Sequence, residues 1–247
     1  MMSRPTRVML CAAVLLASLL TGCQSKDTTL DVLAAASLRD VFPKLATQFE
    51  ADHDGVKVAF SFGPSGTLAA QVKGGAPADV LATASEATMK AAGDTVADPV
   101  VFTANSLAIA VSPEAKTKVT ELSDLAKPDV SVALCEANVP CGATAKEMLA
   151  KTNLTVTPAT YTLDVTGVLT TVESDDVDAG VVYRTDVLSA GDRVVAVEIP
   201  ASSNVSTAYP IATVKASQHT ELANEFVALV RSADGQKALA EAGFDTQ

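Results

Sequence analysis

Short apolar segments with the character of β-strands alternate with helical patterns through most of the 247-residue chain. After each of these segments comes a turn and then apolar residues at spacings of three and four, which is the helical period. The expected strands of this kind cover residues 30–34, 56–62, 79–84, 130–134 and 179–183. Such alternation indicates βαβ units and a parallel sheet covered by helices. The sequence therefore predicts an α/β protein, and sheets of this class bind ligands at the carboxyl ends of their strands.

The first strand-to-helix junction has the features of an anion site. The strand at 30–34 leads to Ser37, and a helical pattern starts at Leu38. We expect Ser37 to be the N-cap of this helix, with Asp40 three residues later as the acid of a short capping box. Small alanines around the turn leave backbone N–H groups accessible, and the positive end of the helix dipole adds to their attraction for an anion.

Later junctions again place a turn and a helix start after a strand. They are Gly63-Pro64-Ser65-Gly66, Val139-Pro140-Cys141-Gly142, Asp164-Val165-Thr166-Gly167, and Tyr183 at the end of its strand. Ser65 or Gly66 is the expected start of the second helix, and the glycines let a ligand approach the backbone closely. A long apolar stretch at 100–111 is expected to cross to a second lobe, with a return crossing near 207–214.

The first 22 residues have the pattern of an export signal. Arg4 and Arg7 precede an apolar run of 13 residues, and Leu20-Thr21-Gly22-Cys23 closes the segment. The run is too short for a membrane span, which needs about 20 residues, and its charge and small residues fit a secretory signal. The closing motif resembles a bacterial lipobox, in which the cysteine becomes lipidated. We predict a lipoprotein signal at 1–22 and a tether at 23–28 with a lipid on Cys23; a plain cleaved signal is the alternative.

The net charge restricts the partners of the protein. The whole chain carries −11 at pH 7, and removal of residues 1–22, which contain two arginines and no acid, leaves −13. A nucleic-acid partner is excluded, because it requires a basic patch. A protein this acidic also cannot collect anions by long-range attraction. An anion site here must therefore work through local dipoles and hydrogen bonds.

Four cysteines occur in the chain. Cys11 lies in the signal and Cys23 in the lipobox-like motif, which leaves Cys135 and Cys141, six residues apart. In an exported protein a pair so close most often forms a disulfide that closes a small loop. Free thiols and a metal site are the alternatives; a metal site would need further ligands, and the two histidines lie at unhelpful spacings.

Catalytic motifs are scarce. The turn at 63–66 resembles that of a serine nucleophile, but the pattern Gly-x-Ser-x-Gly requires glycine where Thr67 stands. His53 and His219 are poorly placed to act as the base for Ser65. The sequence contains no Walker motif, no Gly-x-Gly-x-x-Gly and no metal-ligand cluster. We expect a binding protein rather than an enzyme, and keep a secreted serine hydrolase as the rival from another class.

Six short motifs occur in one order along residues 29–247, and together they closely resemble the molybdate-binding proteins of ABC importers. They are Ala34-Ala35-Ala36-Ser37-Leu38, Phe62-x-x-Ser65-x-Thr67-Leu68-Ala69-x-Gln71, Gly75-Ala76-Pro77-Ala78-Asp79, Val139-Pro140-x-Gly142-x-x-Ala145-Lys146-Glu147, Asp164-Val165-x-Gly167 and Gly180-Val181-Val182-Tyr183. Any one of them is weak evidence. Six in register are strong evidence.

The resemblance implies a type II periplasmic-binding-protein fold, with two α/β lobes joined by two crossing strands and a ligand cleft between them. Lobe I would comprise 29–106 and 207–247, and lobe II 107–206. The ligand would be molybdate or tungstate, with no cofactor and no metal beyond that oxyanion. By motif position, the ligand-binding residues would be Ser37 and Ser65 through hydroxyl and N–H, Cys141 and Val165 through N–H, and Tyr183 through its phenol. Many relatives have alanine in the slot of Cys141, so the change is tolerable where only its N–H is used.

The resemblance also implies partners and a location. The protein would be a monomer, lipid-anchored at the extracytoplasmic face of the cell membrane, that delivers its ligand to the permease subunits of an ABC importer. Sulfate and phosphate are the alternative ligands. Sulfate is smaller than molybdate, and phosphate carries a proton near neutral pH that would require an acceptor. An adhesion or signalling module of the same fold is a third alternative and would lack the clustered donors.

Overall fold

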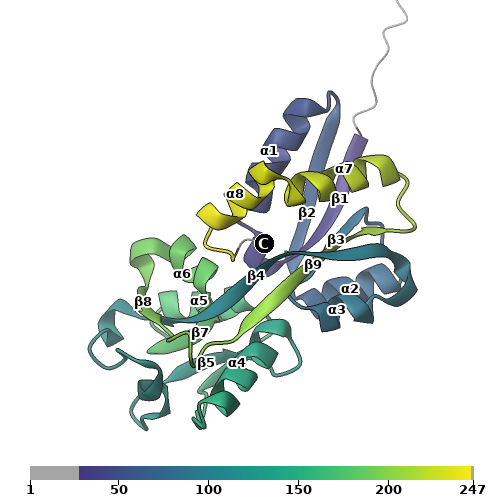
Figure 1. Ribbon diagram of the computed structural model, residues 1–247. Coiled ribbons are helices and arrows are strands. Elements are labelled where there is room, and N and C mark those ends of the chain that lie inside the picture. Colours follow the sequence, from purple (N-terminus) through teal and green to yellow (C-terminus); the bar gives the residue numbers. More distant parts are fainter. Residues whose placement is uncertain (1–27, 246–247) are drawn as a thin grey trace, which may run out of the picture.

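The computed structural model describes residues 28–245, and the predicted signal at 1–22 and the lipidation site Cys23 lie outside this range. Figure 1 shows an elongated α/β molecule in which helices cover both faces of a twisted sheet. Within the described residues the sheet has nine strands, in the order β2-β1-β3-β9-β4-β7-β5-β6, with β8 paired to β4. None of the helices in this part of the chain has the length and apolar character that a membrane crossing needs.

The elements alternate along the chain as the sequence predicts. The strands are β1 (Thr28–Ala35), β2 (Val56–Gly63), β3 (Val80–Ala82), β4 (Val96–Val111), β5 (Val132–Cys135), β6 (Thr160–Thr162), β7 (Ala179–Tyr183), β8 (Val195–Glu198) and β9 (Ser206–Val214). The α-helices are α1 (Phe42–Asp52), α2 (Ser65–Lys73), α3 (Glu86–Ala91), α4 (Pro140–Lys151), α5 (Val165–Glu173), α6 (Arg184–Ala190), α7 (Thr220–Arg231) and α8 (Ala233–Glu241). Short 3₁₀ turns lie at Ala36–Leu38, Gly93–Thr95, Pro113–Ala115, Leu122–Ala126 and Gly191–Arg193.

One half of the sheet is built on β1. It pairs in parallel with β2 on one side and β3 on the other, and β3 pairs antiparallel with β9. Helices α1, α7 and α8 lie over one face, and α2 and α3 over the opposite face (Figure 1). The strand is buried on both faces, because Val32 belongs to the large apolar core with Phe42, whereas Leu33 packs into a second core with Leu68.

The other half of the sheet is built on β5 and β7. These strands pair in parallel with each other, and β5 pairs in parallel with β6. β7 and β8 pair antiparallel with the second part of β4. In the same half of the molecule lie α4, α5 and α6 (Figure 1). Gly180 of β7 packs against α5, where a side chain would meet Val168 at 2.4 Å.

Strand β4 belongs to both halves. Its first part pairs antiparallel with β9 as far as Ser106, and from Leu107 onward it pairs with β7. The chain therefore passes from one half to the other inside β4 and returns where β9 begins. The register with β9 shifts between Ala97 and Val100 and again between Val101 and Thr103. Such bulges increase the local twist of a strand.

The first helix starts later than we predicted, and the predicted N-cap was wrong. A 3₁₀ turn at Ala36–Leu38 follows β1, and α1 begins at Phe42, so Ser37 lies inside the turn and caps no N–H. Pro43 gives the physical reason. It has no N–H, so it could not bond back to the carbonyl of residue 39 as a helix starting at Leu38 requires, whereas proline is tolerated in a first turn.

Asp40 is likewise not the acid of a capping box. Its carboxylate accepts a hydrogen bond from the hydroxyl of Ser189 in α6. This bond connects the turn after β1 with the half of the molecule built on β5 and β7. Asp40 therefore joins the two halves rather than closing the first helix.

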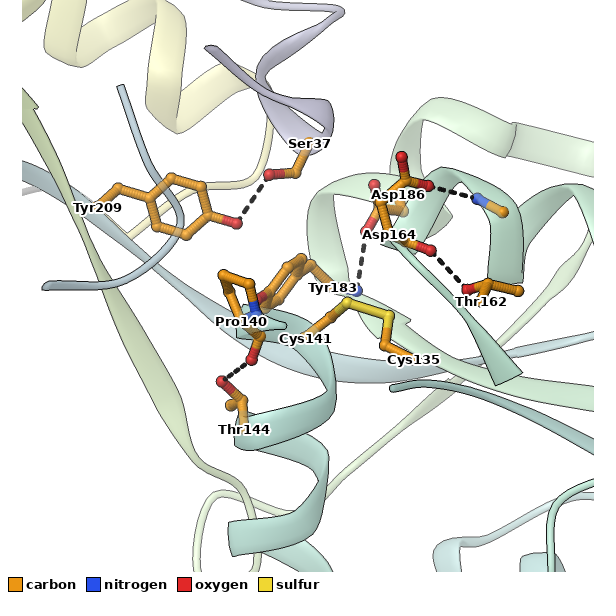
Figure 2. Close-up of a disulfide and its surroundings, with 11 residues drawn as sticks. Ser37, Cys135, Pro140, Cys141, Thr144, Thr162, Asp164, Tyr183, Asp186 and Tyr209 are labelled. Atoms are coloured by element: carbon orange, nitrogen blue, oxygen red, sulfur yellow. Dashed lines mark hydrogen bonds between the residues drawn. A yellow bond between two sulfur atoms is a disulfide. The ribbon is translucent and has the colours of Figure 1, made fainter. Parts of the chain in front are cut away.

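A disulfide joins Cys135, the last residue of β5, to Cys141 in the first turn of α4, with 5.8 Å between their Cα atoms (Figure 2). The favoured pairing is confirmed, and the free-thiol and metal alternatives for these two residues are excluded. The loop is drawn in so tightly that a Cβ at Gly142 would lie 1.9 Å from the carbonyl oxygen of Glu136. The start of α4 is therefore held against the end of β5 by a covalent bond and by close packing.

Reduction of this disulfide should destabilise the protein measurably. Closing a loop of this length lowers the entropy of the unfolded chain by an amount worth about 2 kcal/mol. We expect urea unfolding with dithiothreitol to give a free energy of unfolding lower by about that amount than unfolding without it. A Cys135→Ala/Cys141→Ala variant should not respond to the reductant. Identical curves for the oxidised and reduced wild type would contradict the expectation.

Candidate ligand-binding site

A small cavity lies between the two halves of the molecule, at the carboxyl ends of the strands. Its volume is about 20 Å³, which is room for the centre of a water molecule or a small ion. The lining residues come from the turns after six strands: Ala35, Ala36, Ser37, Gly63, Pro64, Ser65, Ala84, Val139, Pro140, Cys141, Leu163, Asp164, Val165 and Tyr183. A cavity at the ends of several strands is where α/β sheets bind their ligands.

The structure brings all five of the predicted ligand-binding residues to this cavity. The residues are Ser37 in the 3₁₀ turn after β1, Ser65 at the start of α2, Cys141 in the first turn of α4, Val165 at the start of α5 and Tyr183 at the end of β7. They are far apart in the sequence, and each follows a different strand. Their meeting around one small cavity makes this the candidate site.

Three helices begin at the cavity, and the first residues of these helices line it. Ser65 and Val165 are the first residues of α2 and α5, and Cys141 is the second residue of α4 after Pro140. N–H groups in a first turn have no acceptor within their own helix. They carry the partial positive charge of the helix dipole. The cavity wall therefore presents neutral donors suited to an anion.

The hydroxyl of Ser65 can donate a hydrogen bond to a ligand. The side chain is 3% exposed, and its Oγ accepts a hydrogen bond from the N–H of Ala84 at 3.1 Å. Because the oxygen acts as an acceptor toward the backbone, that bond does not use the hydroxyl proton of Ser65, which is available to a ligand in the cavity. Ser65 therefore combines a hydroxyl donor with an N–H donor.

Ser37 offers a second hydroxyl. Its Oγ lies 2.8 Å from the hydroxyl oxygen of Tyr209, and either of the two can be the donor (Figure 2). The residue follows β1 without a regular α-helix, since α1 begins only at Phe42. Its hydroxyl is thus held by a side chain of another strand, β9.

Tyr183 contributes a buried phenol. The side chain is 1% exposed, and its hydroxyl oxygen has no hydrogen-bond partner of normal geometry, although the hydroxyls of Thr144 and Tyr209 are close by. Burial raises the pKa of Tyr183 well above its ordinary value, so the phenol stays protonated. A buried hydroxyl without a partner is costly. At the wall of a cavity, an acceptor on a ligand removes that cost.

Within residues 28–245 the cavity lining contains no lysine, arginine or histidine. Arg39, next to Ser37 in the sequence, lies instead over the ring of Phe62, 5.2 Å from its centroid. Asp164 lines the cavity, and its carboxylate accepts the N–H of Gly167 as the N-cap of α5. No group of His, Cys, Asp or Glu in the described chain is arranged to hold a metal ion. The arrangement can therefore bind a small acceptor-rich anion, and it lacks a base beside Ser65 for hydrolysis.

Sequence reasoning missed Tyr209, which contacts Ser37 without lining the cavity. It lies in the middle of β9, and the apolar pattern of that strand predicts burial only. Asp186 was also missed. Its carboxylate accepts the N–H of Tyr183 at 2.8 Å, behind the cavity wall (Figure 2). Tyr209 is one polar group in a mostly apolar strand, and Asp186 follows Arg184 and Thr185 at a polar helix start. Neither setting tells what the group faces.

The pKa of Asp186 is raised to about 7, mainly by burial and to a smaller extent by the charges of Asp40 and Asp164, against the opposing effect of the N–H of Tyr183. In the unfolded chain an aspartate titrates near pH 4, as a rough reference. Between these pH values the folded protein binds a proton at Asp186 that the unfolded chain has released. The stability that this proton confers is present below about pH 4 and is lost as the pH rises through about 7.

Replacing Asp186 by asparagine should remove this loss of stability with rising pH. A pKa unit corresponds to about 1.4 kcal/mol, so the free energy of unfolding of Asp186→Asn, relative to wild type, should rise by about 2–4 kcal/mol between pH 4 and pH 8. Urea unfolding at a series of pH values measures it. Asp54→Asn, at an exposed position, is the matched control and should run parallel to wild type. Parallel curves for Asp186→Asn as well would show that the carboxyl is already ionised at pH 4.

The site and the fold together define a class of protein: a two-part α/β binding protein with a small anion-compatible cavity. The comparisons identify its family. The family model of the bacterial extracellular solute-binding proteins matches residues 30–245, and the chain belongs to this family.

Two relatives and one solved structure resemble the chain over most of its length. The molybdate-binding protein ModA of Mycobacterium tuberculosis is 37% identical over 216 residues, which are 86% of this chain and 83% of that protein. The protein of the same name from Haemophilus influenzae is 32% identical over 231 residues, 87% of this chain and 89% of its own length. The periplasmic molybdate-binding protein of Azotobacter vinelandii superposes with a TM-score of 0.78 at 18% identity, covering 88% of this chain and 99% of that one.

These findings confirm the predicted α/β fold of type II periplasmic binding proteins. They also confirm that the chain is a solute-binding protein and not an enzyme, since its relatives bind solutes for transport. The rival interpretation as a serine hydrolase is thereby removed. The protein acts outside the cytoplasm, as the family description states.

Proposed function

We propose that the protein binds molybdate in the cavity between its two halves and delivers it to an ABC importer. The observation that carries the proposal is the meeting of five donor-bearing residues from five strand ends around one small cavity without a cation. The molybdate-binding relatives, at 37% and 32% identity over most of their length, support the choice of ligand. Ser37, Ser65, Cys141, Val165 and Tyr183 are the proposed ligand-binding residues.

To bind a dianion, the site must offset the large cost of removing it from water. A dianion moved out of water without partners costs tens of kcal/mol in simple solvation estimates. Seven donors are available: the hydroxyl and N–H of Ser37 and of Ser65, the N–H of Cys141 and of Val165, and the phenol of Tyr183. Hydrogen bonds to a charged group are each worth about 1.5–3 kcal/mol net, and three helix starts add their dipoles. Together these contributions can offset the cost without a positive side chain.

A site of neutral, fixed donors selects by size and by protonation state. Tungstate, which has the same shape and charge as molybdate, should bind as well. Sulfate is smaller and would leave some donors too distant. Phosphate near neutral pH carries a proton that needs an acceptor. The Asp164 carboxylate in the lining accepts the N–H of Gly167 through one oxygen and caps α5 with it. A phosphate proton would therefore have to use its other oxygen, and the titration with phosphate below tests this alternative. The proposed ligands are therefore molybdate and tungstate.

We also propose that the protein has two lobes and is anchored to the membrane. The change of pairing partner within β4 between Ser106 and Leu107 supports a boundary there, with lobe I at 29–106 and 207–247 and lobe II at 107–206. The protein is proposed to be a monomer, anchored through a lipid on Cys23, which lies outside the described residues. From the extracytoplasmic face of the membrane it would present the ligand to the permease subunits.

The first test is a calorimetric titration of the protein lacking residues 1–23 with molybdate, tungstate, sulfate and phosphate. We expect tight binding of the first two and at least 100-fold weaker binding of the others, a difference of roughly 2.7 kcal/mol. Equal affinity for sulfate would overturn the size argument and favour a sulfate-binding protein. Absence of any molybdate binding would overturn the proposed function.

The second test is Ser65→Ala. The loss of one charge-assisted hydrogen bond should weaken molybdate binding by about 1.5–3 kcal/mol, or roughly 10- to 150-fold, measured by the same titration. Ser85→Ala is the matched control, because Ser85 caps α3 by accepting the N–H of Thr88 and does not line the cavity. It should lower stability by about 1 kcal/mol and leave the affinity unchanged. An unaltered affinity in Ser65→Ala would remove Ser65 from the site.

A further inference from the structure

We propose that Tyr209, on strand β9, is a positioning residue that orients the hydroxyl of Ser37 toward the bound oxyanion. The inference rests on the proposed function and extends it to a residue that does not line the cavity. Its basis is the 2.8 Å contact between the hydroxyl oxygens of Ser37 and Tyr209. Figure 2 shows this contact at the side of Ser37 away from its backbone turn.

The ring of Tyr209 is fixed from several sides. The residue is fully buried, and its ring makes edge-to-face contacts with Phe102 at 6.4 Å, Tyr183 at 6.0 Å and Phe244 at 5.4 Å between ring centroids. These neighbours come from β4, from β7 and from the chain after α8. A ring held in this way places its hydroxyl at one point in space. The hydroxyl of Tyr209 is therefore a fixed hydrogen-bond partner for Ser37, which the three-residue turn itself does not provide.

Counting protons gives the direction of the hydrogen bond in the complex. An oxyanion without protons can only accept hydrogen bonds, so Ser37 must use its single hydroxyl proton to donate a hydrogen bond to the ligand. The bond between Ser37 and Tyr209 then requires the proton of Tyr209. Burial raises the pKa of Tyr209 far above its ordinary value, so this proton is present at every physiological pH. A hydroxyl that accepts one bond while it donates another is polarised and donates more strongly.

The position of Tyr209 also links the ligand to the connection between the halves. Its backbone pairs with Thr103 of β4, in the part of the sheet where the chain crosses. Asn105, two residues further along β4, has a buried amide oxygen with no hydrogen-bond partner, and its amide nitrogen donates to Thr185 in α6 at 2.9 Å. The side chain of Asn105 also interacts with the phenol of Tyr209, so polar groups of both halves meet beside this phenol. Tyr183, whose ring contacts that of Tyr209, is itself a proposed ligand-binding residue.

The test is a double-mutant cycle on molybdate affinity. Tyr209→Phe keeps the ring and its contacts and removes only the hydroxyl, and we expect it to weaken binding about tenfold. Ser37→Ala should weaken binding more strongly, since it removes the donor itself. In the Ser37→Ala background, Tyr209→Phe should have no further effect, within about twofold. Tyr161→Phe, at a tyrosine that is 57% exposed, makes the same chemical change outside the site and should leave the affinity unchanged.

The cycle separates positioning from a structural role. A purely structural Tyr209 would give the same loss of affinity in both backgrounds and a lower melting temperature of the ligand-free protein, and this result would overturn the proposal. An unchanged affinity of Tyr209→Phe would overturn it too. A wild-type protein that fails to bind molybdate would instead overturn the proposed function on which this inference rests. Circular dichroism of each variant at the titration temperature verifies the fold.

Discussion

The antiparallel pairing of β4 with β9 is the constraint on which the rest of the structure depends. These two strands carry the chain from one half of the molecule to the other and back. Their pairing sets the distance across which the turns after β1 and β2 face those after β5, β6 and β7. Side chains near this pairing, among them Tyr209 and Asn105, are buried and polar and lie behind the cavity. Alignment of the site is thus a property of the connection as much as of the loops that line it.

The chemistry of the cavity follows from an acidic chain that has to hold an anion. A lysine or arginine in the cavity wall would attract the ligand strongly. Its charge would attract other anions as well, so it would contribute little to selectivity. N–H groups at the starts of α2, α4 and α5 and the hydroxyls of Ser37, Ser65 and Tyr183 act only over short distances. Directional donors of this kind reward one ligand size, because a hydrogen bond weakens steeply when its length or angle departs from the optimum.

Much of the fold could be predicted from the periodicity of apolar residues and from turn chemistry, which also indicated an anion site at the strand ends, whereas the set of five ligand-binding residues came from the resemblance to the molybdate-binding proteins. The turns containing Ser65 and Val165 follow strands and start helices, as their patterns indicate. The start of α1 was predicted wrongly, since the apolar spacing of three and four begins at Leu38 although Pro43 delays the helix. Tyr209 and Asp186 could not be predicted as parts of the site. Their contacts join strands and helices that are distant in the sequence. A prediction that such a residue is buried does not tell which residue it contacts.

The disulfide between Cys135 and Cys141 holds one wall of the cavity in place before any ligand arrives. It ties the first turn of α4, whose Cys141 lines the cavity, to the end of β5. Such bonds form in oxidising compartments and are kept reduced in the cytosol, which agrees with a protein that acts outside the cytoplasm. A wall that is already ordered loses little conformational freedom when a ligand binds. On this side, therefore, a covalent bond rather than the ligand sets the dimensions of the cavity.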